Sequence, residues 1–244
     1  MKLSSKFIWM LAFAIAMGFL EGAVVVYLRE IYYPEGFKFP LVPIEPRLAL
    51  TEIIRELATI IMLVSVAVLA GKTFSQRFAW FIFSFGVWDI FYYVSLKLIL
   101  GWPESLGTWD ILFLIPVTWV GIVFDPVLLS VLMILFAVMI LYYADKNPLT
   151  KITGREWSAL ITGSAFVIAS FTIDYLRFIF SAFSFGDLFN AAKKEAIFQH
   201  LSTYVPENQY ISIFSIGVGL ICLAIIDFFI RNRNENKGRT FENP

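Results

Sequence analysis

The sequence predicts an all-α fold, a polytopic membrane helix bundle, from three observations. Hydrophobic residues make up 59% of the 244 residues and charged residues 16%, against about 25% charged residues in soluble domains. Apolar runs of about 20 residues recur, each long enough to cross a hydrocarbon core of about 30 Å as a helix. Basic residues gather in alternate connections between the runs, as they do on one side of a membrane. The six predicted helices cover residues 7–28, 52–71, 78–98, 126–144, 157–180 and 210–230, in one integral membrane domain over residues 1–244.

The first helix, 7–28, begins like a secretory signal peptide. Ala14 and Ala16 have the small size that a cleavage site needs, but the apolar stretch continues to Leu28. That length exceeds the apolar region of a signal peptide, so we interpret the segment as an uncleaved first span. The second and third helices follow from apolar runs on either side of the polar turn 72–77.

The apolar segment 110–124 comes directly before the fourth helix, 126–144. The two together would form a helix of about 50 Å at 1.5 Å per residue, too long for one bilayer unless strongly tilted. Pro116 and the pair Asp125–Pro126 each disturb a helix. The sequence therefore predicts either a half-helix that re-enters the membrane at 110–124 or the outer part of a kinked fourth helix.

The fifth and sixth helices are separated by the longer connection 181–209. Within it, residues 187–203 place apolar side chains about once per helical turn with polar residues between them. This pattern predicts a short amphipathic helix on the outer surface of the membrane.

The basic residues predict the orientation of the chain. They lie in the N-terminal tail, the 72–77 turn, the 145–156 linker and the C-terminal tail. These segments share one side of the membrane only if 110–144 crosses it once. Both termini are then cytoplasmic, and we expect a multi-pass protein of the cell membrane.

Acidic residues inside the apolar runs indicate a functional site. A charge at the bilayer centre costs about 2.5–3.5 kcal/mol on insertion scales, so such residues usually face a partner or a water-filled cavity. Helical spacing places them on shared faces with basic residues, one face on each of four helices. The candidate solute- or ion-binding residues are Glu21, Arg29, Glu52, Arg55, Glu56, Asp89, Lys97, Asp125, Asp174 and Arg177.

Structural interpretations compete with this one. Asp227 and Arg231 stand four residues apart, which predicts an intrahelical ion pair. Asp174 and Arg177 have the spacing of an ion pair that only fixes helix packing. Asp110 opens the 110–124 segment, where an acid stabilises the start of a helix. The tripeptide Trp-Asp-Ile occurs at 88–90 and 109–111, and we interpret this repetition as chance because the flanking residues differ.

Other chemistries are excluded or left open. The net charge is zero, so no nucleic-acid partner is expected. One cysteine, Cys222, and one histidine, His200, exclude an internal disulfide, a bis-histidine haem and a multi-histidine metal site within this chain. Motifs of serine hydrolases, zinc proteases and phosphate-binding loops are missing. Cofactor, metal and catalytic residues stay undefined.

The charged residues predict a polar cavity that opens outward and binds or translocates a small solute, a proton or a cation. One alternative is an intramembrane enzyme in which a cavity acid works as acid, base or metal ligand and Arg55 or Arg177 holds an anionic, lipid-linked substrate. Another is a non-catalytic subunit whose buried charges pair with partner membrane subunits.

Overall fold

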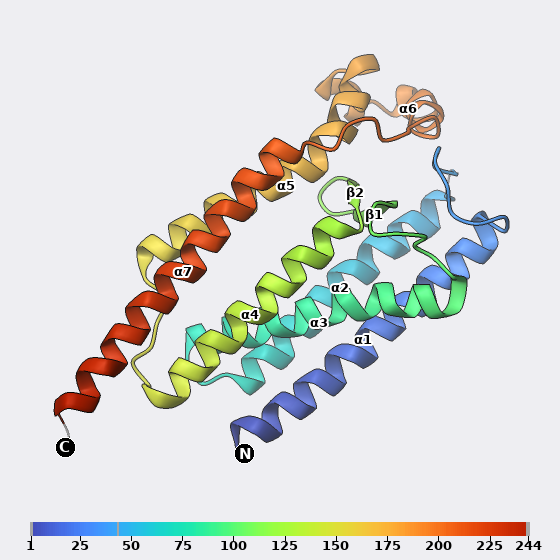
Figure 1. The fold of residues 1–244 in the computed structure, drawn as a ribbon. Helices are drawn as coiled ribbons and strands as arrows, with labels where there is room; N and C mark the ends of the chain where they lie inside the picture. The colour runs from blue at the N-terminus through green and yellow to red at the C-terminus, as the bar shows by residue number, and fades with distance from the viewer. Residues whose placement is uncertain (1, 43, 243–244) are drawn as a thin grey trace.

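The computed structural model describes residues 2–42 and 44–242, without the side chains of 191 and 236–242, and confirms the predicted helical bundle (Figure 1). Six helices of the described chain are long and apolar enough to span a membrane. They are α1 (Leu3–Tyr32), α2 (Pro46–Ala70), α3 (Phe74–Leu100), α4 (Phe124–Lys146), α5 (Gly154–Ala182) and α7 (Ile211–Glu242). Each contains almost the whole of its predicted span and continues beyond it.

Local sequence signals set the ends of these helices. The Thr73 hydroxyl caps α3 by accepting a hydrogen bond from the Gln76 N–H at 3.3 Å. α3 ends at Leu100 and is followed by Gly101, whose φ of +70° is a left-handed conformation that glycine adopts at little cost. Thr153 and Glu156 form a reciprocal capping box at the start of α5.

The helices form two packed groups. α3 lies between α1, α2 and α4, whereas α5 packs along α7, and α7 also contacts α4. The α5–α7 contact is close because a Cβ at Gly217 would lie 2.7 Å from the Gly163 carbonyl oxygen. α1 begins and α7 ends at the same end of the bundle, which we call the terminal end; we call the other the hairpin end (Figure 1).

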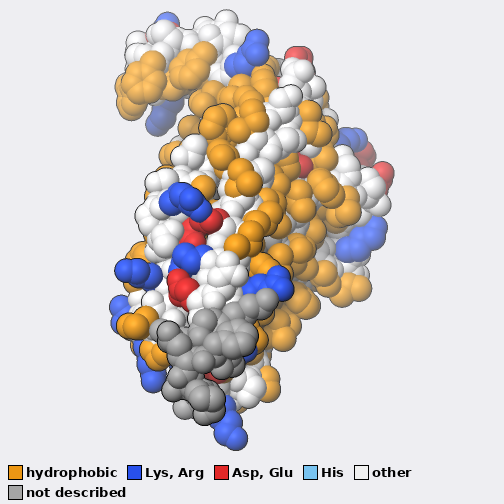
Figure 2. Space-filling model, turned by 60° about the vertical axis from the view of Figure 1, so that its left-hand side comes forward, with side chains coloured by type: hydrophobic (Ala, Val, Ile, Leu, Met, Phe, Trp, Pro, Cys, Tyr) orange, Lys and Arg blue, Asp and Glu red, His pale blue; other side chains and the backbone are white. Residues whose placement is uncertain are grey.

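The surface of the bundle is strongly apolar. Large hydrophobic side chains such as Leu69 and Leu98 are 86% and 80% exposed. Figure 2 shows a broad hydrophobic area on one face of the molecule, beside groups of charged side chains. Such an area is unfavourable in water but suits contact with lipid. The chain is therefore a polytopic membrane protein.

The predicted half-helix at 110–124 is wrong, because this segment forms an antiparallel hairpin. Strands β1 (Trp109–Phe113) and β2 (Trp119–Ile122) pair with Trp109 opposite Ile122 and Phe113 opposite Trp119. Hydrogen bonds across the strands satisfy the backbone where Pro116 prevents a helix. α3 ends and α4 begins at the hairpin end, so the segment returns without crossing the bundle, as the single crossing of 110–144 required.

The fourth helix is not kinked at Asp125–Pro126 as the sequence suggested. α4 begins at Phe124, which places Pro126 in the first turn. The N–H groups of that turn have no partner within the helix, so the proline removes no helical hydrogen bond. The predicted surface helix 187–203 is divided into η1 (Phe185–Phe189), η2 (Ala191–Lys193) and α6 (Lys194–Leu201).

Candidate functional site

A cavity of about 150 Å³ lies near the hairpin end, between α1, α2, α3 and the hairpin. We call it the acidic cavity, because five carboxyl groups and two guanidinium groups line it. These are Glu21, Glu52, Glu56, Asp89 and Asp110 with Arg29 and Arg55. Six of the ten residues predicted from the sequence are in this set.

Arg55 connects two of the acids. Its guanidinium donates hydrogen bonds to Glu52, at 2.8 Å on the same helix, and to Glu21 of α1. Thr59 lies 3.4 Å from the second carboxylate oxygen of Glu21. One positive charge therefore holds two negative charges and joins α1 to α2.

Arg29 pairs with the hairpin. Its Nη2 donates to Oδ1 of Asp110 at 3.1 Å, and the two residues are 7% and 1% exposed. The guanidinium lies over the ring of Trp102 at 3.6 Å and that of Phe37 at 4.4 Å, where cation–π attraction holds it. Tyr93 donates to the other oxygen of Asp110 at 3.2 Å. Burial raises the pKa of Asp110 to about 6, although Arg29 opposes this shift.

Glu56 and Asp89 form no ion pair within the described chain. The carboxylate of Glu56 accepts from the backbone N–H of Leu114, at 3.0 and 3.2 Å. Asp89 accepts from the hydroxyl of Ser130 on α4, at 2.8 Å. With five acids against two arginines, the ionised cavity would contain three negative charges without a counterion.

The other four predicted residues lie outside the acidic cavity. Lys97 donates to the carbonyl oxygens of Gly101 and Pro103, at 2.9 and 2.8 Å, and so closes the end of α3. The carboxylate of Asp125 accepts from the amide of Gln209, at 2.9 and 3.2 Å.

Asp174 and Arg177 do not form the ion pair that their spacing suggested. Asp174 accepts from the hydroxyl of Tyr204 at 2.9 Å and from the backbone N–H groups of Glu207 and Asn208, whereas Arg177 donates to the hydroxyl of Tyr210 at 3.2 Å. Both side chains fix the connection after α6 to α5.

Asp110 and the aromatic wall of the cavity are not among the site residues that the sequence predicts. The sequence places Asp110 at the start of a helix, but the residue lies in β1 and pairs with Arg29. The repeated Trp-Asp-Ile was the available signal, because its two aspartates, Asp89 and Asp110, both line the cavity. The aromatic lining comprises Tyr32, Tyr33, Phe37, Trp88, Tyr92, Tyr93 and Phe113.

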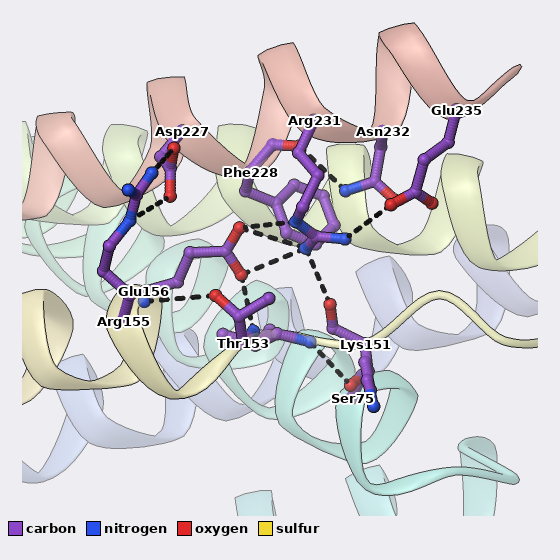
Figure 3. A network of polar contacts seen from close by, with 11 residues as sticks. Ser75, Lys151, Thr153, Arg155, Glu156, Asp227, Phe228, Arg231, Asn232 and Glu235 are labelled. Atoms are coloured by element: carbon purple, nitrogen blue, oxygen red, sulfur yellow. Dashed lines mark hydrogen bonds and ion pairs between the residues drawn. The ribbon is translucent and has the colours of Figure 1, made fainter. Parts of the chain in front are cut away.

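The terminal end has a second group of ion pairs, the terminal network (Figure 3). Arg231 of α7 donates to both oxygens of Glu156 on α5, at 3.0 to 3.1 Å, and to the Lys151 carbonyl at 2.8 Å. Asp227 pairs with Arg155. The predicted Asp227–Arg231 pair is therefore wrong, since each residue has a partner on α5 instead.

Within the described residues, no three histidine, cysteine, aspartate or glutamate side chains are grouped so as to hold a metal ion. Comparisons with protein-family models, with curated proteins and with solved structures found no match.

Proposed function

We propose that the acidic cavity binds a small cation or protons and that the protein moves a solute or ion across the membrane through this cavity. The supporting observation is the excess of three carboxyl groups over guanidinium groups in its wall. An ionised carboxylate away from water is strongly unfavourable unless it is paired, so such a group takes up a proton or a cation. Glu56 and Asp89, which lack an ion-pair partner in the described chain, are the proposed binding residues.

The arginines of the cavity favour this proposal over an enzyme for anionic, lipid-linked substrates. Arg55 contacts two carboxylates and Arg29 contacts one. An anion would therefore meet a wall with surplus negative charge, which repels it. A cation meets a favourable potential.

The proposed orientation places both termini in the cytoplasm and the hairpin end outside, following the basic residues of the terminal end. Single cysteines at 74 and 148, introduced into a Cys222→Ser background, should react with a membrane-impermeant reagent only after the membrane is opened. Cysteines at 104 and 195 should react in intact cells. The opposite pattern would reverse the orientation.

The binding proposal is tested on purified protein by infrared spectroscopy and by thermal unfolding. Without a bound cation, the wild type should show the carbonyl band of a protonated carboxyl group, and Glu56→Gln or Asp89→Asn should weaken it. If a metal cation replaces the proton, Na⁺ or K⁺ should raise the unfolding temperature of the wild type and not of the double variant. Glu30→Gln is the control, because this exposed residue lies beside Arg29 but outside the cavity.

Movement across the membrane needs a separate measurement. In liposomes with an internal pH dye, the wild type and Glu30→Gln should conduct protons or exchange them for a cation, whereas Glu56→Gln with Asp89→Asn should not. Binding without flux would retain the site and remove the transport function. A protein with neither a protonated carboxyl band nor a cation-dependent unfolding temperature would overturn the proposal.

A further inference from the structure

Two buried hydrogen-bond donors, carried by residues that line the cavity, have no acceptor in the described chain. They are Nη1 of Arg29 and the indole Nε1 of Trp88, whose residues are 7% and 6% exposed and both line the cavity. A buried donor without a partner is unfavourable, because it has lost its hydrogen bonds to water and gained none in return. Neither a proton nor a metal cation accepts a hydrogen bond, so a cation at Glu56 and Asp89 leaves both donors without a partner.

The size of the cavity points to a ligand with several heavy atoms. Its volume of about 150 Å³ is close to that of an engineered apolar cavity that holds benzene. A bare inorganic cation fills only a small part of this space. The ligand that fits therefore has room for a charged group and a second functional group.

The aromatic rings in the wall favour an organic cation. Tyr33, Tyr92 and Tyr93 line the same cavity as the surplus acids. The faces of aromatic rings attract ammonium groups, and carboxylates beside them add direct charge pairing. Aromatic rings combined with surplus acids are the chemistry that recognises an alkylammonium group.

We infer that the acidic cavity binds a small organic ammonium compound that carries an oxygen acceptor in the same molecule. The ammonium group pairs with Glu56 and Asp89, and the oxygen accepts from Arg29 and Trp88. Trp88 directly precedes Asp89 on α3, and Arg29 lies on α1, so the two donors come from two of the helices that also carry acids of the cavity. This inference rests on the proposed cation binding and specifies its substrate class; amino alcohols and amino acids share the required chemistry.

The test is calorimetric titration of the purified full-length protein with four probes of similar size. Ethanolamine and β-alanine carry both groups, propylamine lacks the oxygen, and propionate lacks the ammonium. We expect ethanolamine or β-alanine to bind about tenfold or more tightly than propylamine, because a hydrogen bond involving a charged group contributes about 1.5–3 kcal/mol. Preference for β-alanine indicates a carboxylate at Arg29, and preference for ethanolamine indicates a hydroxyl.

Two variants assign the oxygen to its donors. Trp88→Phe removes the indole N–H and keeps most of the ring, and Arg29→Gln with Asp110→Asn removes the guanidinium without leaving a buried charge. Both should reduce the ratio of the affinity for the oxygen-bearing probes to the affinity for propylamine, whereas Glu30→Gln should leave this ratio unchanged.

Equal affinity for propylamine and the oxygen-bearing probes would overturn the inference while cation binding stands. The absence of binding by every probe, in a protein that still responds to K⁺ or shows the protonated carboxyl band, would do the same. If propionate binds and the three ammonium probes do not, both the inference and the proposed function are overturned.

Discussion

The terminal network and the acidic cavity use the same residue types with opposite outcomes. In the terminal network every acid contacts a guanidinium group, and both oxygens of Glu156 accept hydrogen bonds. In the acidic cavity two of five acids have no such contact within the described chain, and two N–H donors have no acceptor there. Buried charge stabilises the bundle where the partners match and indicates a ligand where they do not.

The packing around the two regions also differs. Arg231 lies over the ring of Phe228, which belongs to the main hydrophobic core. The acidic cavity is walled on one side by the hairpin, which does not pack as a helix does. A break in helical packing therefore coincides with the unmatched charges.

The largest effect is expected when the terminal network is broken. Glu156→Ala should lower the free energy of unfolding by about 3 kcal/mol, because it leaves Arg231 without its partner and removes the α5 cap. Glu235→Ala, at the exposed edge of the same network, should cost less than about 1 kcal/mol. Thermal and denaturant unfolding measure both, and equal losses would contradict a difference in burial as the cause.

A somewhat smaller loss is expected when the cavity loses a cation. Arg55→Gln should lower the free energy of unfolding near pH 7 by about 2–3 kcal/mol, because Glu21 and Glu52 then repel each other without a counterion. Adding Glu21→Gln to Arg55→Gln should restore part of that loss. A double variant no more stable than Arg55→Gln would show that Arg55 acts through packing rather than charge.

Packing between α5 and α7 gives the next effect. Gly217→Ala should cost about 1–3 kcal/mol, since its Cβ would lie 2.7 Å from the Gly163 carbonyl oxygen and the helices must separate. Gly219→Ala, whose Cβ would meet no atom within 4 Å, should instead be neutral or stabilising. If both variants unfold alike, the close contact of α5 with α7 is not needed for stability.

The smallest effect concerns the pH dependence of stability at Asp110, in the hairpin outside the spanning helices. Its pKa is raised by burial from an ordinary value near 3.8 to about 6. The folded protein therefore holds this proton more tightly than the unfolded chain does. Stability from this group is present at pH 4 and below, and it is lost as the pH rises to 6.

Asp110→Asn should remove the contribution of this group, whose slope is at most about 1.4 kcal/mol per pH unit. Unfolding curves from pH 4 to 7 provide the measurement, and Glu104→Gln, at an exposed site in the same connection, is the control. A slope that Asp110→Asn leaves unchanged would assign it to other acids of the cavity.

The sequence was sufficient for features that depend on local periodicity. The length of the apolar runs predicted the six long helices, and spacings of three and four residues placed Glu52, Arg55 and Glu56 on one side of α2. The sequence was insufficient where the same apolar composition is compatible with two different structures. The segment 110–124 is as apolar as a half-helix, and strand pairing decided its form.

The sequence also failed to predict the ion-pair and hydrogen-bond partners of charged side chains. These partners lie on segments that are distant in the sequence. Asp227 has Arg231 four residues away, yet α5 brings Arg155 to it from 72 positions earlier. Asp174 likewise contacts the connection before α7 rather than Arg177. Spacing along one helix cannot rank such competing partners.

The contact between Glu56 and Leu114 has a consequence for mutational tolerance. Inside a helix the backbone N–H groups are already bonded to carbonyl oxygens four residues earlier, so they have no hydrogen left for a carboxylate. The hairpin supplies such a donor, and it belongs to the main chain rather than to a side chain. Every amino acid at position 114 except proline retains it, so substitutions there can alter the shape of the wall while this hydrogen-bond donor persists.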